Sequence, residues 1–113
     1  MAVLTVTGRE PTYVVVALDD QAMTLPAWDV ASHLCALFDE GVSTVLVDVT
    51  RLRVLSSHVV AALLSARREA TSRGDRLVLH SATSRGAAMV ARSALAGVFE
   101  LSVGSQPSPW RHP

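Results

Sequence analysis

The chain has 113 residues, and its ten basic and ten acidic side chains give a formal net charge of zero. Half of the residues are hydrophobic and 18% are charged, a composition that favours one packed domain over general disorder. A neutral chain in which 4% of the residues are aromatic lacks the basic surface that nucleic-acid binding requires. We therefore expect no nucleic-acid partner.

Membrane insertion and secretion are not indicated. The longest uninterrupted apolar runs, residues 13–18 and 59–64, are far shorter than the roughly 20 residues that cross a bilayer as a helix. The first ten residues lack a cationic stretch followed by an apolar one, so we expect no secretory signal. Cys35 is the only cysteine and cannot form an internal disulfide. These features predict a cytoplasmic protein.

All ten basic residues are arginine, and lysine, asparagine and isoleucine do not occur. The codons of the three missing residues begin with pairs rich in A and T. We therefore expect a gene from a GC-rich bacterial genome, such as that of an actinobacterium.

The first elements expected along the chain form a hairpin followed by a helix. Residues 4–7 alternate apolar and polar side chains, and Tyr13–Leu18 form a second apolar run. The turn residues between these segments predict that the two strands pair antiparallel. Pro26 suits the first turn of a helix, whose apolar residues recur at helical spacing until Gly41 ends it.

Strands and helices alternate through the rest of the chain. The predicted elements are a strand over 45–49, a helix over 57–73, a strand over 76–80, a helix from Thr83 or Ser84 to Ala96, and a strand over 99–103. The strand over 45–49 is rich enough in valine and leucine to be buried on both faces.

The resulting order, β-β-α-β-α-β-α-β, predicts an α/β domain with a mixed sheet of four to five strands and three to four helices. We assign residues 1–104 to this single domain. Residues 105–113 are rich in proline and serine and are expected to form a flexible tail. An exposed edge on the first hairpin would permit a homodimer.

The junction between the third strand and the second helix carries the strongest functional signal. Asp48 ends the strand, a short loop with two arginines follows, and Ser56 and Ser57 open the helix. A hydroxyl at a helix N-terminus can accept a phosphate because free N–H groups and the helix dipole favour negative charge. The segment therefore predicts a phosphorylation switch. Serine is also a preferred N-cap, worth about 1 kcal/mol, so either serine could instead cap the helix.

This junction resembles the corresponding segment of the STAS family, the sulphate-transporter and anti-sigma-factor-antagonist domain, and the resemblance extends over nearly the whole chain. Family members have a strand that ends near Asp or Asn, an apolar link, and Asp-Ser-Ser/Thr-Gly-Leu at the start of a helix. Asp48 matches the strand end, and Ser57 falls on the phosphorylatable hydroxyl. Ser56, His58 and Val59 stand where the family has Asp, Ser or Thr, and Gly.

The resemblance implies a non-catalytic regulatory module that binds an anti-sigma factor, a serine kinase of the ATPase type, and so controls a sigma factor and transcription. Ser57 would be the phosphorylated residue, with Ser56 as the alternative. The implied partner-binding residues are Asp19, Asp20, Arg53, Ser56, Ser57 and His58. A second possibility stays open, in which the domain is a structural adaptor without a working switch, in a lipid-transport ABC complex or a signalling scaffold.

Catalysis and metal binding receive little support from the sequence. Ser57, His58 and Asp48 are the residue types of a hydrolase triad, but adjacent residues in a turn rarely point their side chains at each other. No nucleophile-elbow glycines flank either serine. The four histidines also lack the spacing of metal ligands. We expect no enzyme activity, no cofactor and no metal.

Overall fold

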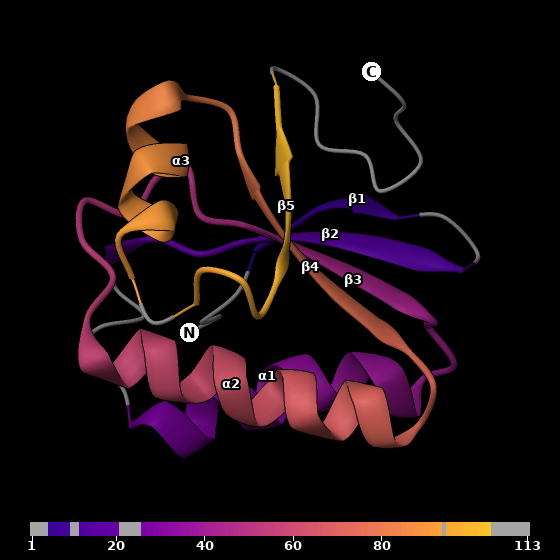
Figure 1. The fold of residues 1–113 in the computed structure, drawn as a ribbon. Coiled ribbons are helices and arrows are strands. Elements are labelled where there is room, and N and C mark those ends of the chain that lie inside the picture. Colours follow the sequence, from indigo (N-terminus) through magenta and orange to yellow (C-terminus); the bar gives the residue numbers. More distant parts are fainter. Residues whose placement is uncertain (1–4, 10–11, 21–25, 94, 105–113) are drawn as a thin grey trace.

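The computed structural model describes residues 5–9, 12–20, 26–93 and 95–104 (Figure 1). The elements are β1 (Thr5–Arg9), β2 (Tyr13–Ala17), α1 (Ala27–Asp39), β3 (Thr44–Asp48), α2 (Ser57–Ser72), β4 (Arg76–Ser81), α3 (Ser84–Ala91) and β5 (Glu100–Val103). The predicted order of elements is confirmed. The tail expected over 105–113 lies outside the described residues, so that assignment stays a prediction.

The strands form one mixed sheet in the order β1-β2-β3-β4-β5, which is also their order along the chain. β1 pairs antiparallel with β2, as the hairpin prediction requires, and the other three pairings are parallel. β1 lies at one edge of the sheet, and its Val6 side chain is 46% exposed. The homodimer expected from that edge remains a prediction.

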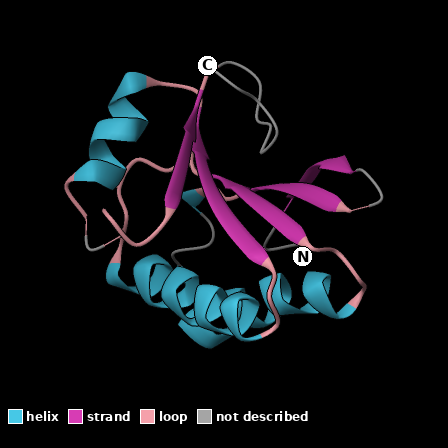
Figure 2. Ribbon diagram, turned by 45° about the vertical axis from the view of Figure 1, so that its right-hand side comes forward, coloured by secondary structure: helices cyan, strands magenta, loops and turns pink. Residues whose placement is uncertain are grey.

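All three helices cover the same face of the sheet. Each parallel connection steps to the next strand in the same direction, and right-handed connections then place every helix on one side (Figure 2). The main core cluster accordingly joins residues of all three helices to alternate strand residues, such as Val45, Val47, Leu77 and Leu79. A smaller cluster of Val15, Leu46 and Val78 lies on the other face of the sheet. β3 is therefore buried on both faces, as predicted.

The limits of α1 and α2 agree closely with the sequence pattern. α1 begins directly after Pro26. We expected this proline in the first turn of the helix, but its extended backbone (ψ 146°) makes it the N-cap instead. Both helices end beside glycines with positive φ, Gly41 at 98° and Gly74 at 75°. No helix among the described residues is both long enough and apolar enough to pass through a membrane.

The end of α3 differs from the prediction, which placed it at Ala96. The helix stops at Ala91 because Ser93 competes for the backbone of the last turn. The Ser93 hydroxyl donates to the Val90 carbonyl at 2.7 Å and accepts from the Leu95 N–H at 3.1 Å. Leu95 still reaches the core, where it is fully buried, but from a turn and not from the helix.

Gly86 fixes the start of α3 against the end of β4. Thr83 caps the helix by accepting from the Gly86 N–H at 3.0 Å, and the Ser81 hydroxyl donates to the Thr83 carbonyl at 2.9 Å. A methyl group on residue 86 would overlap the Ser81 hydroxyl. Since Ser81 is buried, its side chain cannot turn away without losing that hydrogen bond.

Gly86→Ala should therefore lower the free energy of unfolding by about 1–3 kcal/mol, the usual effect of overpacking. Urea denaturation followed by circular dichroism measures the change. The matched control is Gly86→Ala made in a Ser81→Ala background, where the hydroxyl is absent and the loss should be smaller. Equal losses in the two backgrounds would contradict this explanation.

Candidate functional site

The loops that follow β2, β3 and β4 meet at one end of the molecule. The carboxyl ends of parallel strands lie along the same edge of a sheet, and backbone hydrogen bonds continue the pairing beyond the strands. The Leu18 N–H donates to the Asp48 carbonyl at 3.0 Å, and the Val49 N–H donates to the His80 carbonyl at 2.9 Å. Residues implicated by the sequence in two separate loops are thereby brought to one surface.

Asp48 anchors the loop between β3 and α2. Its carboxylate accepts from the backbone N–H of Thr50 at 3.0 Å and from the Thr50 hydroxyl. That hydroxyl in turn accepts from the Ala82 N–H at 2.8 Å, which joins the loop to the end of β4. The Asp48 carboxylate is therefore directed to Thr50, whereas a hydrolase triad would need it on His58.

Asp20 and Arg53 join the two loops. The Arg53 backbone N–H donates to the Asp20 carboxylate at 3.3 Å, and its guanidinium Nε donates to the other carboxylate oxygen at 2.8 Å. These two hydrogen bonds hold the pKa of Asp20 below its ordinary value, the backbone bond having the larger effect. Both residues were expected at a partner surface, but the sequence did not indicate that they bond to each other.

Ser56 and Ser57 have different surroundings. Ser56 is the N-cap of α2, and its hydroxyl accepts from the Val59 N–H at 3.3 Å. Ser57 is the first residue of the helix, and its side chain is exposed, as is that of His58. Within the described residues, no hydrogen bond from the Ser57 hydroxyl is recorded. The capping role, which the sequence left open between the two serines, therefore belongs to Ser56.

Apolar residues hold this loop against the domain. Leu52 is buried in the main core, and Leu55 packs against that core while half-buried. Val54, between them, is 52% exposed. Val59, which stands where the family has glycine, is fully buried in the core. The loop is thus anchored on both sides of an exposed apolar residue.

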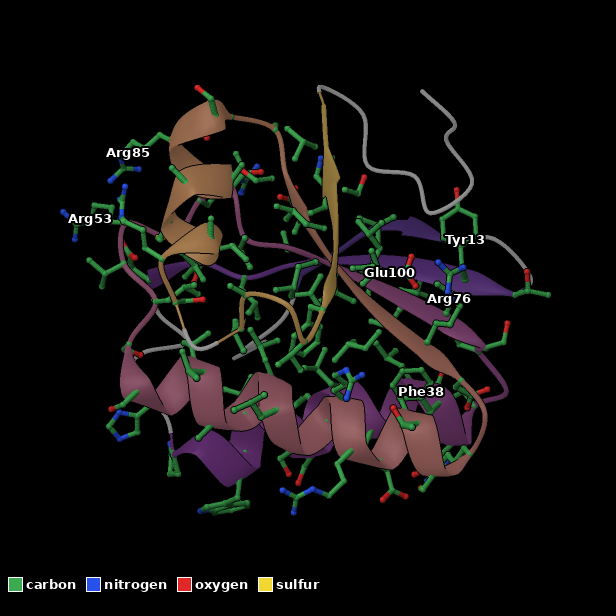
Figure 3. The ribbon with its side chains drawn as sticks, in the orientation of Figure 1. Tyr13, Phe38, Arg53, Arg76, Arg85 and Glu100 are labelled. Carbon is green, nitrogen blue, oxygen red and sulfur yellow. The ribbon has the colours of Figure 1, made fainter. Side chains whose placement is uncertain are left out.

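Two further arginines lie at the same end of the molecule, Arg85 in α3 and Arg92 as its C-cap, and sequence reasoning missed them. Arg85 donates from Nη2 to the Arg53 carbonyl at 3.3 Å (Figure 3). Arg92 lies seven residues further on, a spacing that places both residues on one side of a helix. The spacing of the two arginines was visible in the sequence. It points to a shared site only once α3 is known to lie beside the β3–α2 loop.

The described residues contain no group of three or more His, Cys, Asp or Glu side chains arranged to hold a metal ion. Cys35 is half-buried in α1, and burial raises the pKa of its thiol, which makes it a poor nucleophile.

The two serines can be distinguished by stability. Ser56→Ala should lower the free energy of unfolding by about 0.5–2 kcal/mol because the Val59 N–H loses its cap. Ser57→Ala should change it by less than about 0.5 kcal/mol, as is usual for exposed positions. Urea denaturation of the two variants side by side measures both values. A larger loss for Ser57→Ala than for Ser56→Ala would show that Ser57, and not Ser56, provides the cap.

The bond between Asp20 and Arg53 predicts a pH dependence. A lowered pKa of Asp20 in the folded state means that its stabilising effect is present above the ordinary pKa of aspartate and is lost as the pH falls through the lowered value. An NMR titration of the side-chain carboxyl carbon should show this shift. Arg53→Gln should raise the pKa only partly, because the backbone N–H remains, and the control Arg51→Gln should leave it unchanged. An ordinary pKa for Asp20 in the unmodified protein would refute the pairing.

Comparison with known proteins places this geometry in a family. A family model described as "Mlab, STAS domain" matches residues 7–102. No functionally curated protein matches the chain significantly.

Solved structures share the fold at low sequence identity. A structure of the stressosome, described as a signal integration and transduction hub, contains a chain with 18% identity and a TM-score of 0.67, with 86% of each chain covered. A serine-to-glutamate variant of RsbS from Moorella thermoacetica has 17% identity and a TM-score of 0.69, covering 91% of this chain and 89% of the other. The anti-sigma factor antagonist SpoIIAA in its unphosphorylated form has 17% identity and a TM-score of 0.60, covering 92% of this chain and 89% of the other. On the family match and on the fold, the chain belongs to the STAS domain family.

Proposed function

We propose that the protein is a non-catalytic cytoplasmic regulator of the anti-sigma factor antagonist type. It binds an ATP-dependent anti-sigma kinase, which phosphorylates Ser57 and thereby ends the association. The observation that carries this proposal is the division of roles at the start of α2. Because Ser56 provides the cap, the exposed Ser57 hydroxyl is available to another protein.

The local electrostatics favour a phosphate at this position. A phosphate monoester adds about −1.5 to −2 charge near neutral pH. The first turn of α2 contains no acidic residue that would repel it. The N–H groups at the start of a helix have no partner within the helix, and here the Ser56 hydroxyl accepts only that of Val59. The N–H groups of Ser57 and His58 are therefore placed to face an anion.

The effect of phosphorylation would fall on binding and not on the fold. Ser57 is exposed, so the domain can accommodate the added group without repacking its core. A dianion at the centre of a docking surface has to be desolvated when the partner binds. A loss of about 3 kcal/mol weakens affinity by more than a hundredfold.

The proposed docking surface combines the β3–α2 loop with the loop after β2. Arg53, Ser56, Ser57 and His58 come from the first, and Asp19 and Asp20 from the second. The bonds between Asp20 and Arg53 tie the two loops into one surface. The similarity of fold to SpoIIAA, an anti-sigma factor antagonist solved in an unphosphorylated form, supports the same role here.

Incubation with a purified ATP-dependent anti-sigma kinase from the same genome should add one phosphate, detected by intact-mass spectrometry. Ser57→Ala should abolish the added mass, whereas the control Ser56→Ala should retain it. Phosphate on another residue, or none with every such kinase of the genome, would count against the proposed switch.

A second candidate is a structural adaptor without a working switch, for instance in a lipid-transport ABC complex. The family description, which begins with Mlab, favours it, as do His58 and the buried Val59 at positions where the family motif has other residues. Ser57→Asp separates the candidates when binding to the protein's own partner, a kinase or a transporter subunit, is compared with that of the unmodified protein. It should weaken binding by more than about a hundredfold in a phosphorylation switch, the equivalent of 3 kcal/mol, and only modestly in an adaptor.

A further inference from the structure

An open pocket with a volume of about 300 Å³ lies between the β3–α2 loop and α3. Its lining residues are Arg53, Val54, Leu55, Arg85, Met89, Arg92 and Ser93. Figure 3 shows the side chains of Arg53 and Arg85 on the same side of the molecule, one from the loop and one from α3. This volume is at the lower end of the range found for small-molecule sites, about 300–1,000 Å³.

The pocket is positively charged although the whole chain is neutral. Three of its lining residues are arginines, and none is acidic. Arg53 forms an ion pair with Asp20. The Arg85 guanidinium donates a hydrogen bond to the backbone carbonyl of Arg53, which carries no charge. Among the described residues, no ion pair or hydrogen bond of the Arg92 side chain is recorded.

Two arginines elsewhere in the domain are paired with acids. Arg73 pairs with Asp39 at 2.5 Å and with Glu69 at 3.2 Å, and Arg76 pairs with Glu100 at 2.7 Å. The positive charges of Arg85 and Arg92 have no such acidic partner within the part of the chain that the structure describes. The pocket therefore concentrates positive charge at one place on a neutral chain.

The rest of the lining is mostly apolar. Val54 is 52% exposed, and Leu55 and Met89 are half-buried and pack against the main core. A guanidinium group presents a planar fork of donors that matches the oxygens of phosphate or carboxylate. The lining thus suits a ligand with an anionic head and a small apolar body.

We propose that this pocket binds a small phosphate monoester. A phosphate carries more negative charge than a carboxylate and offers three acceptor oxygens, so it can bond to more than one guanidinium at once. Arg85 and Arg92 would hold the phosphate, and Val54 and Met89 would contact the apolar body. The inference does not depend on phosphorylation of Ser57, which is not among the lining residues.

Phenyl phosphate is a suitable probe. Titrated into the ¹⁵N-labelled protein at low ionic strength, it should produce saturable shifts in the amide signals of residues 53–55 and 85–93. Phenylacetate has a similar body with a single carboxylate, and benzyl alcohol has a similar body without charge. We expect phenyl phosphate to bind most tightly and benzyl alcohol to show no saturable binding.

Matched single substitutions test the role of the arginines. Arg85→Gln and Arg92→Gln should each weaken phenyl phosphate binding by roughly tenfold or more, as expected from the loss of a charge-assisted hydrogen bond. Arg68→Gln, which removes an exposed arginine of α2 outside the pocket, should leave the affinity unchanged. The amide spectrum of each free variant establishes that it is folded.

Four results would overturn the proposal. These are the absence of saturable shifts, shifts spread over the arginines of the whole surface, an equal effect of Arg68→Gln, and binding of phenylacetate or benzyl alcohol as tight as that of phenyl phosphate. The last result would show a site for carboxylates or for apolar groups alone.

Discussion

The parallel pairing of β2, β3, β4 and β5 in chain order is the constraint on which the rest of this structure depends. It directs the end of every parallel strand to the same edge of the sheet, where the connecting segments after Ala17, Asp48 and Ser81 begin. Right-handed connections between successive strands then place all three helices on one face. The position of Ser57 follows from this arrangement, because α2 starts where the β3 loop returns to cover the sheet.

Within that arrangement, the start of α2 separates a capping serine from an exposed one. The Ser56 hydroxyl satisfies a backbone N–H, and the buried Val59 fixes the first turn in the core. Ser57 contributes to neither task, so chemical change at its hydroxyl need not disturb the helix. A single serine at this junction would have had to serve as both cap and acceptor.

Much of this could be predicted from local patterns. Alternating and continuous apolar runs indicated the strands, and Gly41 and Gly74 marked the ends of two helices. The end of α3 was predicted wrongly because apolar residues at helical spacing continue to Leu95, while one hydroxyl at Ser93 turns the backbone. Helical periodicity does not register such a side-chain bond to the backbone.

The parts of the site that depend on long-range contacts could not be predicted. Asp20 and Arg53 are 33 residues apart, and nothing in either loop specifies the other as its partner. Arg85 acquires its role only because α3 packs beside the β3–α2 loop. In contrast, Ser57 could be proposed from sequence because its signal is local, a hydroxyl at the junction of a strand and a helix.

The sheet order has one more consequence. In doubly wound α/β proteins the strand order reverses, and the crevice at that reversal is where ligands bind. The strands here advance across the sheet without turning back, so no such crevice forms between diverging connections. The candidate surface of this domain accordingly lies on the rim, where side chains can be exchanged without rearranging the scaffold beneath them.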